Sequence, residues 1–169
     1  MLKYTHLLVA KRIAVNCNLT KSQSFWLQFG SVIPDCKLSC FTRPHNKENW
    51  YYRAHGMFIE LTDEPHDSNF YYKLGVVLHL YCDFFTRPHS NISMHYIKDG
   101  HAKWERQLHS YIKEHYTGKL VVTDEILDDL VQTYDSNDET INNDFEYITK
   151  ACNILCYKTG VLEDVQKYR

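Results

Sequence analysis

The sequence predicts an all-α fold in a single domain. Apolar residues recur at helical spacing along most of the chain, no segment alternates apolar and polar residues as a strand would, and no linker or low-complexity tract divides it. A chain of 169 residues is long enough to bury one sizeable core. We therefore expect one helical bundle that spans residues 1–169.

The first part of the chain predicts three helices, at residues 3–16, 21–32 and 47–61, each with its apolar side chains on one face. Pro34 prevents a smooth continuation of the second helix, because a proline disfavours the helical conformation of the residue before it. Asp35 is therefore expected on a turn just beyond the end of that helix, followed by a loop.

The most apolar helix is expected at residues 69–85, with Asp67 or Ser68 as its N-terminal cap. The run Leu74–Leu78 directly precedes His79, and a helix that is apolar on most sides belongs in the core. His79 and Asp83 should therefore be buried. A buried carboxylate is costly without a partner, so the sequence calls for a group that neutralises Asp83.

Three more helices are expected after a polar connection, at about 101–116, 123–134 and 138–158. The last two ranges begin with the acidic pairs Asp124-Glu125 and Asp138-Glu139. Acidic side chains suit the positive end of a helix dipole, so we expect these pairs to mark the first turns.

Composition excludes several classes of protein. Hydrophobic residues make up 44% and aromatic residues 14% of the chain, which excludes a disordered protein, and a net charge of -2 gives no basic face for nucleic acid. The six Cys residues are too sparse for a disulfide scaffold and the N-terminus shows no signal peptide, so we expect reduced thiols and a cytoplasmic protein. No window provides the roughly 18 apolar residues of a transmembrane helix.

Five side chains that bind metals lie within one short segment: His79, Asp83, His89, His101 and Glu105. His79 and Asp83 are four residues apart, and so are His101 and Glu105, which places each pair on one face of a helix. Zinc accepts neutral imidazoles and carboxylates as ligands. Spacing alone does not establish a metal site, because the chain has three such His–acid pairs where chance predicts about one. The apolar helix around His79 and the Pro-His turn at His89 favour a metal site.

A five-residue segment occurs twice: the sequence of residues 41–45 recurs at residues 85–89. Both copies end in a histidine after a proline, and each follows an aspartate, Asp35 or Asp83. Nothing around the two copies extends the match. We therefore interpret His45 and His89 as candidate ligands, and not as parts of a structural repeat.

The region from Leu74 to Glu105 resembles the signature of the zinc-dependent phospholipase C family of bacteria. That signature has LG-x₃-H-x₃-D on an apolar helix, a Pro-His loop and H-x₃-E on the following helix. Zinc-dependent single-strand nucleases belong to the same superfamily. Upstream, the segment around His6 resembles the early helical histidine of the family, Pro34-Asp35 its P-D turn, and His45 the histidine that follows. The resemblance covers about residues 3–110, and helices at about 120–158 would complete the bundle.

The resemblance implies two or three zinc ions in the core of an all-helical bundle. The ligands of one ion would be Asp35, His45, His79 and Asp83. The ligands of a second would be His89, His101 and Glu105. His6, with Asp83 as a bridge, would help to hold a third. Secreted members supply the amine and carbonyl of an N-terminal Trp to that third ion. This chain begins with Met1 and has no such Trp, so the resemblance does not extend to that ligand.

The resemblance implies metal-assisted hydrolysis of a phosphoester. Paired metal ions lower the pKa of a bound water, whose hydroxide attacks phosphorus. Asp83 would bridge or orient the ions, and Asp35 would be a ligand, the base or both, which makes these two the candidate catalytic residues. The expected substrate is a small phosphoester or a phospholipid head group.

Alternative functions stay open. The metal ions could stabilise a helical domain without catalysis, because metal binding contributes to folding free energy. A nuclease is a second alternative, and a phosphohydrolase of the HD type, with His66-Asp67 as its adjacent pair, is a third. His55 and His66 are rivals of His45 as ligands. The sequence does not specify the oligomeric state.

Overall fold

The computed structural model describes residues 1–36, 46–90 and 100–162, and these ranges contain helices and no strand. The seven α-helices in them are α1 (Lys3–Asn16), α2 (Lys21–Val32), α4 (Lys47–Leu61), α5 (Ser68–Phe84), α6 (His101–His115), α7 (Leu127–Tyr134) and α8 (Ile141–Lys158). Two short 3₁₀ helices, η1 (Pro34–Cys36) and η2 (Arg87–His89), follow α2 and α5. The predicted all-α fold is confirmed.

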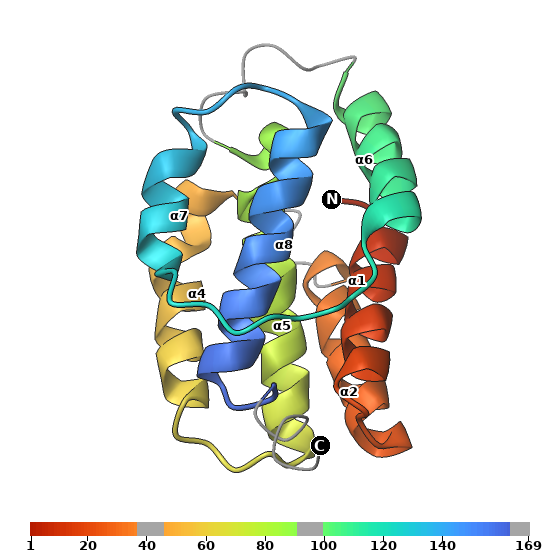
Figure 1. Ribbon diagram of the computed structural model, residues 1–169, viewed down its shortest axis with the longest axis vertical. Coiled ribbons are helices and arrows are strands. Elements are labelled where there is room, and N and C mark those ends of the chain that lie inside the picture. The colour runs from red at the N-terminus through yellow and green to blue at the C-terminus, as the bar shows by residue number, and fades with distance from the viewer. Residues whose placement is uncertain (37–45, 91–99, 163–169) are drawn as a thin grey trace.

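The central position in the bundle belongs to α5 and α8. Figure 1 shows both helices in the middle, with α4 and α7 on one side and α1, α2 and α6 on the other. Helix α5 packs against α1, α2, α4 and α8 and is buried along most of its length. The predicted burial of His79 and Asp83 is confirmed, because they are 1% and 0% exposed. Both titratable side chains therefore lie in the core.

Side-chain caps fix where several helices begin. Asp67 caps α5, its carboxylate accepting a hydrogen bond of 2.9 Å from the backbone N–H of Phe70, as one of the two predicted caps. The expected starts of the last two helices were too early, by four residues for α7 and by three for α8. Helix α8 begins at Ile141 because Thr140 caps it, accepting from the backbone N–H of Asn143 at 3.0 Å. The acidic pairs precede α7 and α8 and do not form their first turns.

Helices α2 and α5 touch through their backbones at two glycines. A Cβ atom on Gly30 would lie 2.1 Å from the carbonyl oxygen of Tyr72, and one on Gly75 would lie 2.2 Å from that of Leu27. Real side chains do not tolerate such distances, so only glycine permits this approach. The contact brings the C-terminal end of α2, and with it Asp35, close to the face of α5 that carries His79.

Two further sequence-based expectations concern thiols and membranes. Five of the six Cys residues lie in the described ranges, and each is a free thiol, whereas Cys40 lies outside those ranges. Within the ranges that the structure covers, no helix has the length and apolarity needed to cross a bilayer.

Candidate metal centre

Three elements bring together an upstream group of potential ligands: His6 from α1, Asp35 from η1 and His79 from α5. Each offers one ligand atom, and these atoms lie within 4.8 Å of one another. The Nε2 atom of His79 is 3.7 Å from Oδ1 of Asp35, and the rings of His6 and His79 stack with centroids 3.8 Å apart. The three side chains therefore converge on one small volume.

A downstream group consists of His89 on η2 together with His101 and Glu105 on α6, again with ligand atoms within 4.8 Å of one another. Oε1 of Glu105 lies 3.1 Å from Nε2 of His89 and 3.2 Å from Nε2 of His101. His101 and Glu105 are one turn apart on the same face of α6, as their spacing predicts. His101 is the most exposed of the three, with 44% of its side chain accessible, so it lies on the outer side of this group.

Asp83 connects the two groups from the core. Its Oδ1 lies 3.2 Å from Nε2 of His6, and its Oδ2 lies 3.2 Å from Nε2 of His79. The same Oδ1 is 2.6 Å from the backbone amine of Met1. That amine also lies 2.8 Å from Nε2 of His89 and 3.0 Å from Oε1 of Glu105. A chain of contacts therefore runs from the upstream group through Asp83 and the amine to the downstream group.

The amine of Met1 is the group that sequence reasoning missed. The resemblance offered no terminal ligand at this point, because it pointed to a Trp that the chain lacks. The structure instead places the terminal nitrogen of a methionine between Asp83 and Glu105. This amine belongs to the main chain and not to a side chain, so the pattern of side chains carries no signal for it. Burial lowers the pKa of this amine, but the negative charges of Asp83 and Glu105 outweigh burial and raise it.

The orientation of His79 is set by the backbone of α2. Its Nδ1 donates a hydrogen bond of 2.8 Å to the carbonyl oxygen of Ser31. The proton on Nδ1 leaves Nε2 with a lone pair, and Nε2 is the atom that faces Asp35 and Asp83. Hydrogen bonding at the outer nitrogen is how proteins fix the tautomer of a metal-binding histidine. The Gly30–Gly75 contact therefore has a direct role in aiming this ring.

Electrostatics keep the cluster in the protonation states that metals bind. Burial, followed by the proximity of His79, lowers the pKa of His6 to about 3, so its imidazole is neutral. Burial also lowers the pKa of His89. Burial alone would raise the pKa of Asp83 and of Glu105, yet the surrounding positive and hydrogen-bonding groups, including the Met1 amine, lower both. At these four side chains the result is two neutral imidazoles and two ionised carboxylates, which are donors suited to zinc.

One ring also has a polar atom that calls for a partner. His6 is 1% exposed, and within the described residues its Nδ1 makes no hydrogen bond, whereas its Nε2 faces Asp83. Burying such atoms without a hydrogen bond is costly. A metal ion bound through one nitrogen would satisfy it, so the residues present fit zinc.

The other histidines have different surroundings. His45 lies outside the described residues. His55 lies 3.4 Å from Asp128, and Nε2 of His66 is 2.8 Å from the carbonyl oxygen of Thr159. Neither joins the two groups, so the rivals of His45 are placed elsewhere.

A family model described as zinc-dependent phospholipase C matches residues 5–157. The chain belongs to the zinc-dependent phospholipase C family. The match includes every side chain of the two groups and Asp83. Neither a curated protein nor a solved structure matches the chain. Membership of the zinc-dependent phospholipase C family confirms the resemblance and identifies zinc as the metal that these donors suit.

Adding one glycine before Met1 should lower the stability of the zinc-free protein. The extension converts the amine into an uncharged amide, so Asp83 and Glu105 lose their nearest positive charge. Breaking a buried ion pair by removing one partner costs about 3–5 kcal/mol. Urea unfolding in the presence of a chelator measures the change. A glycine added after Arg169 is the control, and equal stability of the two extended proteins would contradict the assigned role of the amine.

Proposed function

We propose that this protein is a zinc-dependent phosphoester hydrolase with two or three ions in the buried centre. The observation that supports this most directly is the continuity of the two ligand groups through Asp83 and the Met1 amine. His6, Asp35, His79 and Asp83 would hold zinc at the upstream group, with His45 as a further proposed ligand. His89, His101 and Glu105 would hold it at the downstream group. Bound zinc would act as a Lewis acid and lower the pKa of a bound water to about 7.

The two aspartates are suited to different tasks. The Asp83 side chain is 1% exposed and touches both histidines of the upstream group, so it would serve as a fixed negative charge that bridges or orients the ions. The Asp35 side chain is 18% exposed and lies at the rim, on the short helix η1. Its access to solvent allows it to accept a proton from the attacking water and release it, beside its role as a ligand.

Zinc content and hydrolysis together test the proposal. Protein reconstituted with zinc should contain two or three ions per chain and should hydrolyse bis(p-nitrophenyl) phosphate and a short-chain phosphatidylcholine. Absence of bound zinc together with absence of hydrolysis of both substrates would reject it.

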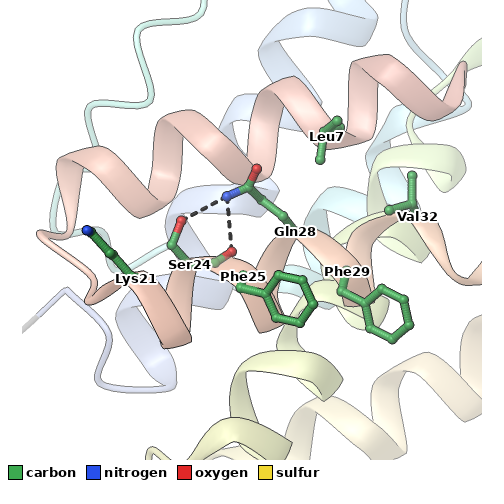
Figure 2. Close-up of a pocket in the computed structure, with 7 residues that line it drawn as sticks. All are labelled: Leu7, Lys21, Ser24, Phe25, Gln28, Phe29 and Val32. Carbon is green, nitrogen blue, oxygen red and sulfur yellow. Dashed lines mark hydrogen bonds between the residues drawn. The ribbon is translucent and has the colours of Figure 1, made fainter.

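An apolar groove on α1 and α2, the helices that carry His6 and Ser31, favours a lipid phosphoester as substrate. The groove, of about 450 Å³, runs along α1 and α2. Its lining residues are Leu7, Lys21, Ser24, Phe25, Gln28, Phe29 and Val32 (Figure 2). Lys21 and Ser24 lie at one end, whereas Leu7, Phe29 and Val32 lie toward the other.

Two residues at the apolar end of the groove are neighbours in the sequence of residues that form or orient the metal centre. Leu7 follows His6, and Val32 follows Ser31, whose carbonyl oxygen receives the hydrogen bond of His79. We propose that this groove seats the acyl chain of a phospholipid whose head group reaches the zinc ions. A groove with a single lysine is poorly suited to a nucleic acid, since phosphate backbones are bound by several positive charges.

Replacing Phe29 with Ala should reduce kcat/KM for short-chain phosphatidylcholine about tenfold, because covering a large apolar side chain contributes about 1.5–3 kcal/mol. Hydrolysis of bis(p-nitrophenyl) phosphate, which has no acyl chain, should be unchanged. The control is Ile59→Ala on α4. Ile59 is 52% exposed, which is similar to the 41% of Phe29, and it lies outside the groove. Equal loss with both substrates would reject the groove as the acyl-chain site.

A further inference from the structure

Three hydrogen-bond donors from three elements meet at one buried carboxylate, that of Asp144 on α8. Tyr134 donates its hydroxyl to Oδ1 at 2.5 Å. Oδ2 accepts from the indole Nε1 of Trp104 at 2.7 Å and from the backbone N–H of Arg87 at 3.0 Å. Asp144 is 0% exposed, and burial raises its pKa, so a carboxylate is held in this position at a cost. Both of its oxygens are used.

Two of these three donors belong to the segments that carry the downstream group. Trp104 directly precedes Glu105 on α6, and consecutive helical residues point about 100° apart. Trp104 therefore reaches α8 while Glu105 faces the metal centre. Arg87 begins η2, the turn that ends with His89. Asp144 thus binds one atom from each of the two segments whose ligands must meet.

Hydrogen bonds within the turn that carries His89 restrain its conformation. Fixing the position of Arg87 therefore also restrains the position of the His89 imidazole. The backbone N–H of His89 donates to the carbonyl oxygen of Thr86 at 2.8 Å, and the hydroxyl of Ser90 donates to that of Arg87 at 3.0 Å. The Arg87 guanidinium is also fixed, with Nη2 3.1 Å from the carbonyl oxygen of Asn137. The turn is therefore anchored at its first residue and closed on itself.

We propose that Asp144 is a positioning residue for the downstream metal ligands, because it ties η2 and α6 to the same point on α8. Its hydrogen bonds set the separation of His89 and Glu105, whose ligand atoms lie 3.1 Å apart. The proposal rests on the proposed function, in that the downstream group holds zinc. Residues that orient metal ligands through hydrogen bonds, without binding the metal themselves, typically contribute about 10–100-fold to metal affinity.

Two substitutions that each remove one hydrogen bond to Asp144 test this role. Trp104→Phe releases the segment that carries Glu105, whereas Tyr134→Phe removes a bond to the same carboxylate from α7, which carries no ligand. In zinc titrations, Trp104→Phe should weaken the binding of one ion about 10–100-fold and leave the ion at the upstream group unchanged. Tyr134→Phe should bind all ions within about twofold of the original protein. The Co²⁺ absorption spectrum should change only in Trp104→Phe.

A second pair acts on Asp144 itself. Asp144→Asn keeps an oxygen that can accept from Arg87 and Trp104, while its amide can donate to Tyr134, so it should retain most of the zinc affinity. Asp144→Leu has a similar shape but accepts nothing, and should lose the downstream ion. If Asp144→Leu fails to fold, the comparison of Trp104→Phe with Tyr134→Phe decides alone.

Equal zinc affinities of Trp104→Phe and Tyr134→Phe would overturn the positioning role, and so would loss of ions from both groups together. Failure of the proposed function has a different signature. An original protein that binds zinc but hydrolyses no phosphoester would reject the enzyme and leave the titrations valid. An original protein that hydrolyses phosphoesters, with variants of unchanged zinc affinity, would reject Asp144 alone.

Discussion

Replacing Asp83 with Asn should abolish zinc binding at the buried centre and, with it, hydrolysis. Asp83 contacts both histidines of the upstream group and the Met1 amine that leads to Glu105. Residues that only hydrogen-bond to metal ligands already contribute about 10–100-fold to metal affinity. A central ligand should therefore contribute at least about 100-fold. Metal analysis after dialysis against zinc, together with kcat/KM for bis(p-nitrophenyl) phosphate, measures both losses.

The control for this substitution is Asp129→Asn, an equivalent change at an exposed aspartate of α7. It should retain the full zinc content and the full rate. An Asp83→Asn protein that is folded, contains all its zinc and hydrolyses at the original rate would show that Asp83 is only a structural anion. The circular dichroism spectrum of each variant shows whether it is folded, and zinc content and rate are compared only between folded variants.

Removing zinc with a chelator should abolish hydrolysis and lower the melting temperature while leaving the bundle folded. Each site saturated at 100 times its dissociation constant adds about 2.7 kcal/mol of stability, so two sites add roughly 5 kcal/mol. For a chain of this length that corresponds to a decrease of roughly 10–20 °C in melting temperature. The protein should stay folded because the apolar core extends along α4, α5, α7 and α8, and the Met1 amine supplies positive charge to Asp83 and Glu105. Calorimetry with and without chelator measures the shift.

The same experiment separates catalysis from the alternative in which zinc only stabilises a helical domain. Return of hydrolysis on adding zinc back to folded, chelated protein would support the enzyme. Global unfolding on chelation, with no detectable hydrolysis in the zinc-loaded state, would support the structural alternative.

Periodicity predicted the helices well where apolar residues recur on one face. The ranges 3–16, 21–32 and 47–61 match α1, α2 and α4, and the apolar run before His79 identified α5 as the core helix. The prediction was less accurate at the starts of α7 and α8. Acidic pairs suit a helix dipole only within the first turn, but the cap decides where that turn lies, and Thr140 is the residue that caps α8.

The spacing of residues predicted which side chains of the candidate centre share a helix, but not how the helices meet. His101 and Glu105, or His79 and Asp83, follow from local geometry. The position of His6 beside Asp35 and His79 depends on the packing of α1, α2 and α5, which a single sequence does not specify. Asp144 resembles an ordinary acidic residue in the first turn of a helix, and only the tertiary structure shows its three donors.

The backbone contact between α2 and α5 extends the functional constraint to residues that have no functional group. Gly30 and Gly75 bind nothing, yet a single methyl group on either would push the helices apart and move Ser31 and Asp35 away from His79. Substitution to alanine, the mildest change that most positions can receive, would here be as severe as the loss of a ligand. Among variants of this chain that keep the zinc centre, we expect these two glycines to vary as little as the histidines themselves.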